Sequence, residues 1–341
     1  MTATTGRPAL VLGLDAGGTS TRAVVASAEG EVLGRGSGAG ANQHSARDPA
    51  AALTEALRAA LTGLDPARVA VGVLGLAGAG AAGLARAERL AATAWEQAGL
   101  TGRPTVVTDL AVAFAAATAG PDGTLLLAGT GAVSALFRDR AAVRRCDGYG
   151  WLVGDEGSGV WLGREAVRAA LGALDGRAEP TSLVRAVSQA LLGDGGTGEG
   201  GTDDGGTGDG GTGDGVSDGP AQRLVGAVYA AEPARLGALA PVLDAVAREG
   251  DAVALRIVAE GAACLLRSAL ALGPVDPGAP FVLAGSLLTR STLLAARVRA
   301  GLAAAGVAGP LVAEDGAAGA AALALRGLGA ADAVHERLIK N

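Results

Sequence analysis

The sequence predicts an α/β protein of two similar halves with a ligand cleft between them. The chain has 341 residues, a length that suits two domains better than one. A strand that ends in a turn of glycine and threonine occurs twice, at residues 10–25 and again at 124–137. Other apolar strands alternate with helical stretches, as in folds that bind ligands where strands lead into helices.

The overall composition is that of a globular protein with few aromatic side chains. Hydrophobic residues make up 49% of the chain and charged residues 18%, which is enough to build cores and gives no sign of general disorder. The net charge of -6 and the aromatic content of 2% argue against a nucleic-acid partner, because they supply neither a basic stripe nor a stacking platform. Neither a signal peptide nor a membrane-spanning run is apparent, so we expect a cytoplasmic protein. Cys146 and Cys264 lack metal-ligand spacing and are expected to be reduced thiols.

The first glycine turn has the features of a phosphate site. An apolar strand ends in Asp15, and Gly17 and Gly18 allow the backbone to approach a ligand closely. Thr19 and Thr21 add hydroxyl donors, which suits a triphosphate, and Asp15 is a candidate partner for Mg²⁺. An ordinary tight hairpin explains the same pattern, so the turn alone leaves both interpretations open.

The rest of the first half supplies a second carboxylate at the end of a strand. We expect a third strand at 31–36, a polar loop at 37–45, a helix capped by Asp48, a strand at 69–78 and a helix at 84–97. Asn42 in the loop offers a donor and an acceptor to a polyol, or simply stabilises a turn. Asp109 ends the strand at 105–109 and is either a general base or the cap of the helix at 110–118.

The second half opens with the same plan as the first. Its turn contains Gly129, Thr130 and Gly131, so two turns could grip one polyphosphate from opposite sides of a cleft. Helices are expected at 165–174, 183–192, 221–230 and 252–272, where they form a wall of the second domain and offer a face for a homodimer. A final strand and alanine-rich helix lie within 311–321.

The sequence divides into domains at 1–119 and 120–330, with two further segments. Residues 193–220 are nearly all glycine, threonine and aspartate and predict a flexible acidic insertion. A calcium-binding β-roll would need a large apolar residue in each repeat, and none precedes Val216. Residues 331–341 predict a short amphipathic tail in which His335 is solvated.

These motifs resemble the N-acetylglucosamine kinase and BadF/BadG-type ATPase family, in the superfamily that also holds other sugar kinases, heat-shock ATPases and actin. The resemblance covers nearly the whole chain outside the glycine-rich insertion. It is carried by the two turns and, most specifically, by residues 148–163, Gly-Tyr-Gly-Trp-Leu-Val-Gly-Asp-Glu-Gly-Ser-Gly-Val-Trp-Leu-Gly. It implies a two-domain actin-like ATPase fold of ribonuclease H-like repeats, with a cleft between the domains.

The resemblance also implies roles for individual residues. Asp109 would accept a proton from a sugar hydroxyl, and Asp15 would lie nearest Mg²⁺. The implied ATP contacts are Gly17, Gly18, Thr19, Thr21, Gly129, Thr130, Gly131, Gly285 and Ser286. The implied sugar contacts are Asn42, Asp109, Gly148, Tyr149, Gly150 and Asp155. In the adenosine motif at 281–288, Ala284 replaces the first glycine of the family, which leaves the nucleotide preference open.

The activity implied by the resemblance is ATP-dependent phosphorylation of the 6-hydroxyl of glucosamine or N-acetylglucosamine. The acid pair Asp155 and Glu156 favours free glucosamine as an accepted substrate, although the residues are compatible with either sugar. An ATP-hydrolysing activator of a radical dehydratase is an alternative, but Cys146 and Cys264 lack the setting of an iron–sulfur site. A non-catalytic sugar sensor is a second alternative, which the intact turns and Asp109 disfavour.

Overall fold

The computed structural model contains two sheets with the same topology. It describes residues 9–41, 48–80, 82–193 and 219–340. The first sheet has the order β3-β2-β1-β4-β5 and the second has the order β10-β9-β6-β7-β8. The strands of the first sheet are β1 (Leu10–Ala16), β2 (Ser20–Ser27), β3 (Val32–Ala39), β4 (Val69–Leu76) and β5 (Thr105–Thr108). Those of the second are β6 (Gly123–Ala128), β7 (Ala132–Arg138), β8 (Ala141–Asp147), β9 (Phe281–Ala284) and β10 (Leu311–Ala313).

Each sheet combines a three-stranded antiparallel meander with two parallel strands. In the first sheet β2 pairs antiparallel with β1 and β3, while β4 runs parallel to β1 and β5. In the second sheet β7 pairs antiparallel with β6 and β8, while β9 runs parallel to β6 and β10. The duplicated α/β plan predicted from the two glycine turns is therefore confirmed.

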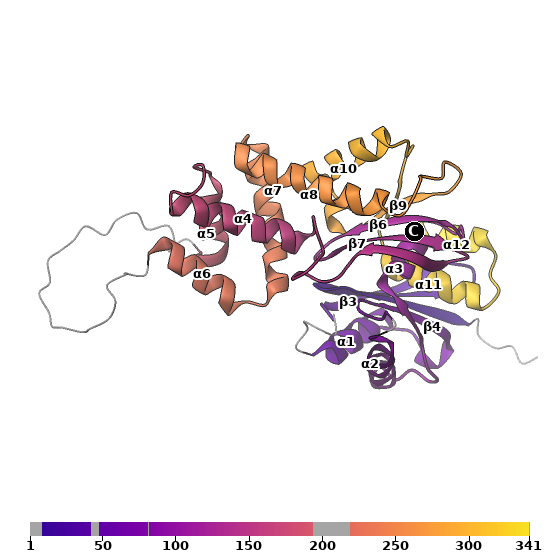
Figure 1. Cartoon of the computed structure of the whole chain (residues 1–341). Coiled ribbons are helices and arrows are strands. Elements are labelled where there is room, and N and C mark those ends of the chain that lie inside the picture. Colours follow the sequence, from indigo (N-terminus) through magenta and orange to yellow (C-terminus); the bar gives the residue numbers. More distant parts are fainter. Residues whose placement is uncertain (1–8, 42–47, 81, 194–218, 341) are drawn as a thin grey trace, which may run out of the picture.

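The helices cover both faces of the two sheets (Figure 1). Helices of the first half are α1 (Pro49–Ala60), α2 (Leu84–Gln97) and α3 (Asp109–Ala115), with a 3₁₀ turn η1 (Pro66–Arg68). Those of the second half are α4 (Gly159–Leu174), α5 (Leu183–Leu192), α6 (Pro220–Ala230), η2 (Pro233–Leu239), α7 (Ala240–Arg248), α8 (Ala252–Leu270), α9 (Ser286–Thr289), α10 (Leu293–Ala304), α11 (Gly316–Gly327) and α12 (Asp332–Ile339). None of the helices in the described parts of the chain is long and apolar enough to span a membrane.

Local sequence explains where several of these helices begin. Asp48 accepts a hydrogen bond from the N–H of Ala51 and Pro49 occupies the first turn of α1, as its sequence predicts. Helix α2 spans the predicted range, and Ser158 caps α4 through the N–H of Trp161.

Strand β8 and helices α7 and α10 were not predicted from the sequence. Residues 194–218 of the expected acidic insertion lie outside the described residues.

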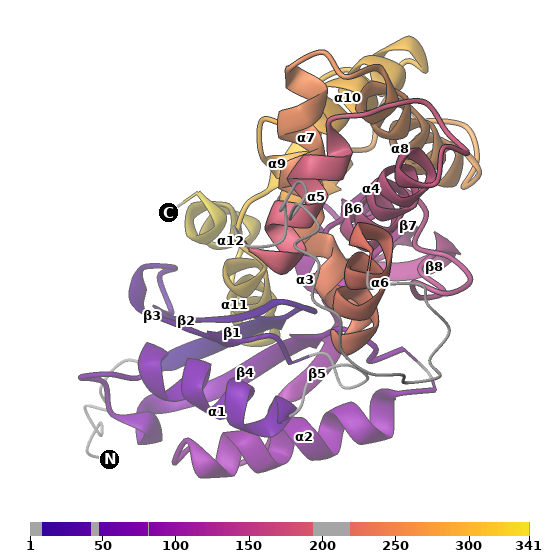
Figure 2. The same cartoon turned by 90° about the vertical axis from the view of Figure 1, so that its left-hand side faces the viewer.

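Two helices lie between the sheets, each packed against the sheet of the other half (Figures 1 and 2). Helix α11 packs on β1, and alanines of α11 share a buried cluster with Val11. Helix α3 instead contributes Phe114 to a cluster with Phe137 of β7 and Val282 of β9. The outer faces are covered by α1 and α2 on the first sheet and by α4, α8 and α10 on the second. The middle layer thus joins the two halves and holds the start of α3 beside the ends of the strands.

The C-terminal helix α12 corrects one expectation. His335 is buried, with 3% of its surface exposed, and its Nε2 lies 2.7 Å from the carbonyl oxygen of Ala115 at the end of α3. The expectation that His335 is solvated was therefore wrong. The helix folds back onto α11, with Leu338 in the same cluster as the alanines of that helix, so its apolar face becomes core.

Candidate active site

The two glycine and threonine turns face each other. The first joins β1 to β2 and the second joins β6 to β7. A Cβ atom added at Gly18 would lie 3.4 Å from the side chain of Thr130, so the turns are within van der Waals reach. No described residue accepts a hydrogen bond from the backbone N–H groups of Gly18, Thr19, Thr130 or Gly131. Unpaired N–H groups at two facing turns are donors that suit an anionic ligand.

Thr21 does not share this arrangement. Its side chain is completely buried and its Oγ1 donates a hydrogen bond of 2.7 Å to the carbonyl oxygen of Ala39. The hydroxyl joins β2 to the end of β3, so the structure does not present it to a ligand. The sequence could not show which of Thr19 and Thr21 points toward a ligand, because the direction of each side chain depends on where β2 begins.

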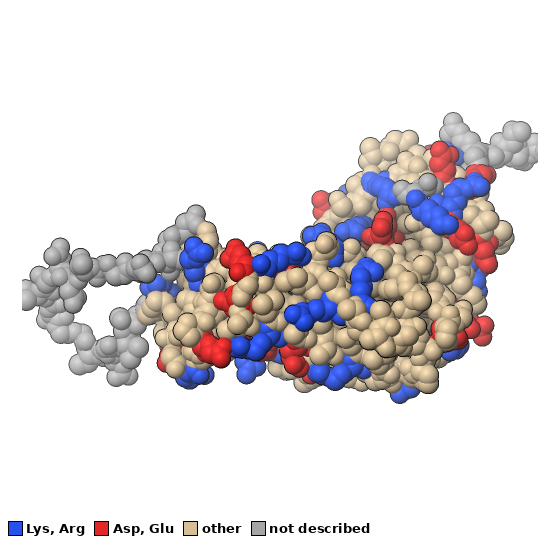
Figure 3. Space-filling view, turned by 90° about the horizontal axis from the view of Figure 1, so that it is seen from above, with Lys and Arg blue, Asp and Glu red and all other residues tan. Residues whose placement is uncertain are grey.

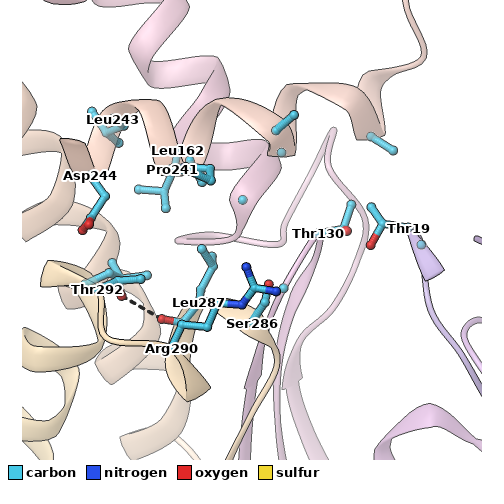
Figure 4. Close-up of a pocket in the computed structure, with 18 of the residues that line it drawn as sticks. Thr19, Thr130, Leu162, Pro241, Leu243, Asp244, Ser286, Leu287, Arg290 and Thr292 are labelled. Atoms are coloured by element: carbon cyan, nitrogen blue, oxygen red, sulfur yellow. Dashed lines mark hydrogen bonds between the residues drawn. The ribbon is translucent and has the colours of Figure 1, made fainter. Parts of the chain in front are cut away.

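A cavity of about 550 Å³ begins at the two turns (Figure 4). Thr19 and Thr130 lie side by side at one end, and Ser286 lines the cavity further along. The other end is lined by the apolar residues Leu162, Pro241, Leu243 and Leu287 and also by Asp244, Arg290 and Thr292. An end with free N–H groups and an end with apolar and polar side chains match the two parts of a nucleoside triphosphate.

The start of α4 supports the second turn from behind. The N–H of Gly159 donates to the carbonyl oxygen of Gly129 at 2.8 Å, and the N–H of Val160 donates to that of Thr130 at 3.3 Å. These bonds use carbonyl oxygens of the turn and fix its backbone. They also place the second part of the motif at 148–163 directly behind the second turn.

Gly285 brings the adenosine-like motif against the same turn. Its φ is 84°, and a Cβ atom there would lie 2.3 Å from the carbonyl oxygen of Ala128, so only glycine fits. Ala284, which departs from the family pattern, is buried at the end of β9 opposite Leu127. The departure therefore changes the strand and leaves the glycine of the turn itself in place.

Asp15 and Asp109 lie at the ends of β1 and β5, the two neighbours of β4. Burial and the negative charge of Asp109 raise the pKa of Asp15 to about 7, although Arg22 opposes the shift. Burial also raises the pKa of Asp109, and the N–H of Leu110 and the charge of Arg145 work against that rise. A carboxylate with a raised pKa is better suited to accept a proton near neutral pH.

The cap of α3 is Thr108 rather than Asp109. The side chain of Thr108 accepts a hydrogen bond from the N–H of Ala111, while Asp109 Oδ1 accepts only from the adjacent N–H of Leu110. Asp109 is thus the first helical residue. The capping role that the sequence also allowed for Asp109 therefore belongs to its neighbour Thr108.

Asp15 fits a role beside a hydrated Mg²⁺ ion. Its carboxylate is partly buried, makes no ion pair among the described residues, and lies against Gly316, where a Cβ atom would be 2.2 Å from Oδ2. The described residues contain no group of three or more carboxylate, histidine or cysteine ligands that could hold a metal alone. One carboxylate with water and phosphate oxygens is a usual environment for Mg²⁺.

The first part of the motif at 148–163, residues 148–154, forms a loop after β8. Gly148 and Gly150 lie in this loop with positive φ, and 66% of the Tyr149 surface is exposed. The charge of Arg145 on β8 acts to lower the pKa of both Asp109 and Asp155, so Arg145 lies near both carboxylates. The structure therefore brings this loop and Asp109 to the same region, whereas Asn42 lies outside the described residues.

The acid pair of the loop divides between two directions. The carboxylate of Asp155 lies against Gly131, where a Cβ atom would be 2.8 Å from its Oδ2. Glu156 instead points to Arg267 of α8, with Oε2 3.8 Å from Nη2. The two acids do not act as one anionic patch.

Two residues near this loop escaped the sequence analysis. Asp147 is buried and accepts hydrogen bonds from three backbone N–H groups of the loop. Its position before a glycine-rich segment was a possible signal of a turn-forming role. Arg145 carried no signal, because its relation to Asp109 depends on the pairing of β8 with β7.

Known proteins resemble this chain in sequence and in fold. The N-acetyl-D-glucosamine kinase of Dictyostelium discoideum is 30% identical over 195 residues, which span 53% of this chain and 60% of that protein. The structure of a candidate N-acetylglucosamine kinase from Chromobacterium violaceum matches with a TM-score of 0.68 and 25% identity, over 93% of this chain and 99% of that one. A ROK family glucokinase from Streptomyces griseus, in complex with glucose and AMPPNP, matches with a TM-score of 0.56 and 20% identity over the same shares.

These likenesses confirm the predicted α/β fold of two domains of the actin-like ATPase type. A family description matches residues 12–324, which include both glycine turns, Asp109, the loop after β8 and the adenosine-like motif. The chain therefore belongs to the BadF/BadG/BcrA/BcrD ATPase family.

Proposed function

We propose that this protein is an ATP-dependent amino-sugar kinase that phosphorylates the 6-hydroxyl of N-acetylglucosamine or glucosamine. The observation that carries the proposal is the placement of Asp109. It lies close enough to Asp15 to raise the pKa of that residue, and Asp15 leads directly into the first of two facing turns. A candidate base and a candidate phosphate site are thus adjacent.

The cavity supports ATP as the phosphoryl donor. The free N–H groups of the two turns and the hydroxyls of Thr19 and Thr130 would hold the phosphates, and Ser286 would lie near the ribose. The end lined by Leu162, Pro241, Leu243 and Leu287 would bind the adenine ring. Asp15 would hold Mg²⁺, which when bound neutralises charge on the phosphates that develops during transfer.

Asp109 would act as the general base. It accepts the proton of the sugar 6-hydroxyl while that oxygen forms a bond to the γ-phosphorus, and the bond from this phosphorus to the bridging oxygen breaks to release ADP. Asp155, Gly148, Tyr149, Gly150 and Asn42 would position the sugar. The positive charge of Arg145 opposes the rise in the pKa of Asp109 and so favours its ionised form.

The choice of sugar rests on different evidence for the two candidates. The Dictyostelium discoideum relative is named for N-acetylglucosamine, which favours the acetylated sugar. The separate directions of Asp155 and Glu156 leave one carboxylate of the pair on the side of the second turn. We retain glucosamine as an accepted substrate and expect a pocket that also tolerates the acetyl group.

The cysteines argue against an electron-transferring activator. Cys264 is buried in α8, and burial raises the pKa of its thiol to about 11 despite the nearby Arg267. Cluster ligation requires thiolates, so this residue is a poor ligand. Cys146 lies on β8, an edge strand of the second sheet.

A coupled assay of ADP release tests the proposed function. We expect turnover with Mg²⁺, ATP and N-acetylglucosamine or glucosamine, with kcat/KM at least about tenfold above that for glucose. Phosphorus and proton NMR of the product would locate the phosphate on the 6-oxygen. Absence of turnover with both amino sugars, or a preference for glucose, would contradict the proposal.

A further inference from the structure

Asp147 occupies an unusual position at the end of β8. It has a φ of 64°, and Asp155 eight residues later has a φ of 54°. Left-handed backbone is uncommon for residues other than glycine and has an energetic cost unless other contacts compensate. The two aspartates mark the two ends of the proposed carbohydrate loop, residues 148–154.

The Asp147 carboxylate closes this loop. Its Oδ1 accepts hydrogen bonds of 2.7 Å from the N–H groups of Gly148 and Asp155, and its Oδ2 accepts one of 2.8 Å from Glu156. Gly154 passes so close that a Cβ atom there would lie 2.4 Å from Oδ1. Charge-assisted bonds to three backbone donors on a buried side chain are strong enough to fix the backbone at both ends of the loop.

The closed end of the loop is attached to the second phosphate turn. The N–H of Ala132 is hydrogen-bonded to the Asp155 carboxylate, which also packs against Gly131. Further along the chain, Gly159 and Val160 donate hydrogen bonds to the turn. Asp147 holds Asp155 by its backbone N–H, and Asp155 holds the turn by its side chain.

We propose that Asp147 is a positioning residue that mechanically couples the loop at 148–154 to the glycine turn at 129–131. Asp147 uses both carboxylate oxygens on the loop backbone, so it acts through Asp155. Through this link, sugar binding at the loop strengthens nucleotide binding at the turn, which rests on the proposed function. Coupling of this kind is reciprocal between the two ligands.

Replacement of Asp147 by glycine removes the carboxylate and keeps the backbone. Glycine accepts a φ of 64° without strain, so Asp147→Gly retains the path of β8 into the loop. The matched control is Asp139→Gly, since Asp139 has a φ of 48° in the turn between β7 and β8 and its side chain accepts no hydrogen bond from the described residues. Asp147→Asn keeps one acceptor oxygen and should restore part of the wild-type behaviour.

Hydrogen–deuterium exchange of the ligand-free protein measures the mechanical coupling. Asp147→Gly should increase exchange at 148–156 and also at Gly129 and Ala132, the two hydrogen-bonded N–H groups of the second turn, and Asp139→Gly should change neither segment. Increased exchange that stops at the loop, or equal exchange in the two variants, would overturn the inference. This measurement requires no substrate.

Nucleotide affinity with and without sugar measures the functional coupling. In the wild type, N-acetylglucosamine should tighten binding of a non-hydrolysable ATP analogue by a factor in the range of about 5–150. Asp147→Gly should lose most of this factor and raise the KM for sugar about tenfold, with little change in affinity for the analogue alone. Wild-type coupling in Asp147→Gly would overturn the inference.

The two proposals fail in different ways. If the wild type phosphorylates no amino sugar, the proposed function fails and exchange alone decides whether Asp147 couples loop and turn. If the wild type is active but Asp147→Gly and Asp139→Gly behave alike, the proposed function stands and the inference fails.

Discussion

The carboxylates of Asp15 and Asp109 approach each other across the end of β4, close enough that the charge of Asp109 contributes to the raised pKa of Asp15. Two residues separated by more than ninety positions in the chain thus share one electrostatic environment. Like charges at this separation are unfavourable in the ligand-free protein, and a cation or a transferred proton relieves the repulsion.

Replacement of Asp109 by asparagine tests its role as a base. The amide preserves size but accepts no proton, so kcat should fall by roughly 10²–10⁴-fold. Affinity for ATP, measured by calorimetry, should remain that of the wild type because Asp109 does not line the nucleotide cavity. Wild-type turnover by Asp109→Asn would refute the assignment.

Replacement of Asp15 by asparagine should stabilise the metal-free protein at alkaline pH. The pKa of Asp15 is raised from 3.8 to about 7, so the folded state binds more protons than the unfolded state between these values and stability falls as the pH rises. The shift sets an upper bound of about 4 kcal/mol at pH 8. We expect about 2 kcal/mol from urea unfolding in the presence of EDTA, because the amide still needs partners.

The same variant at pH 4 provides the control for this measurement. There the folded wild type is almost fully protonated at Asp15 and the unfolded state is partly protonated, so most of the difference in unfolding free energy should disappear. A destabilised Asp15→Asn at pH 8 would show that the carboxylate contributes to the fold rather than to ligand binding. We also expect the variant to lose turnover, as a trade of activity for stability.

An alanine at Gly129 should weaken nucleotide binding without unfolding the protein. A Cβ atom there meets no protein atom within 4 Å, and Gly129 lines the cavity at its phosphate end. The methyl group would crowd a bound phosphate, so ATP affinity should fall about tenfold, or about 1.4 kcal/mol. Gly226→Ala, in α6 and equally free of neighbours, is the matched control and should bind ATP normally.

His335 should make the protein less stable in mild acid. Burial lowers its pKa below the usual 6.5, although Asp332 and the carbonyl of Ala115 oppose the shift and Arg326 and Arg140 reinforce it. Below pH 6.5 the unfolded state therefore takes up a proton that the folded state does not, and stability falls with the pH. The free energy of unfolding should therefore be lower at pH 5.5 than at pH 7.5.

His335→Gln isolates this contribution, because glutamine can donate to Ala115 but does not titrate. Between pH 7.5 and pH 5.5 the wild type should lose more free energy of unfolding than the variant. Subtracting the variant also removes the opposite slopes of Asp15 and Asp109, whose pKa values are raised. An identical pH dependence of the two proteins would contradict the prediction.

The elements that the sequence predicted well have strong local signals. Three patterns each specify a structure within a few residues. They are the apolar run of β1 with its glycine turn, Asp48 and Pro49 at the start of α1, and the helical periodicity of apolar residues in α2. The repeat of the first pattern at β6 and β7 gave the duplication. Local chemistry was sufficient because none of these features depends on distant contacts.

The missed elements depend on tertiary context. Strand β8 is an edge strand whose first five residues are exposed, so it lacks the apolar run that marked the other strands. His335 became core only because α12 folds onto α11, a contact that local sequence does not encode. The role of Asp147 likewise arises from bonds to residues up to nine positions away.

The surface seen from above gives one further comparison with the sequence. Basic and acidic side chains are interspersed there and are divided by uncharged surface (Figure 3). Net charge alone predicted an anionic protein but could not give this distribution.

The placement of α3 and α11 has a consequence for synthesis on the ribosome. The inner face of the first sheet needs alanines from positions 317–325, so this sheet cannot finish its core until α11 has been translated. Meanwhile its apolar inner strands would stay open to chaperones. A nascent chain halted after the first half would retain that unfinished surface, whereas a chain that includes α11 and α12 covers it.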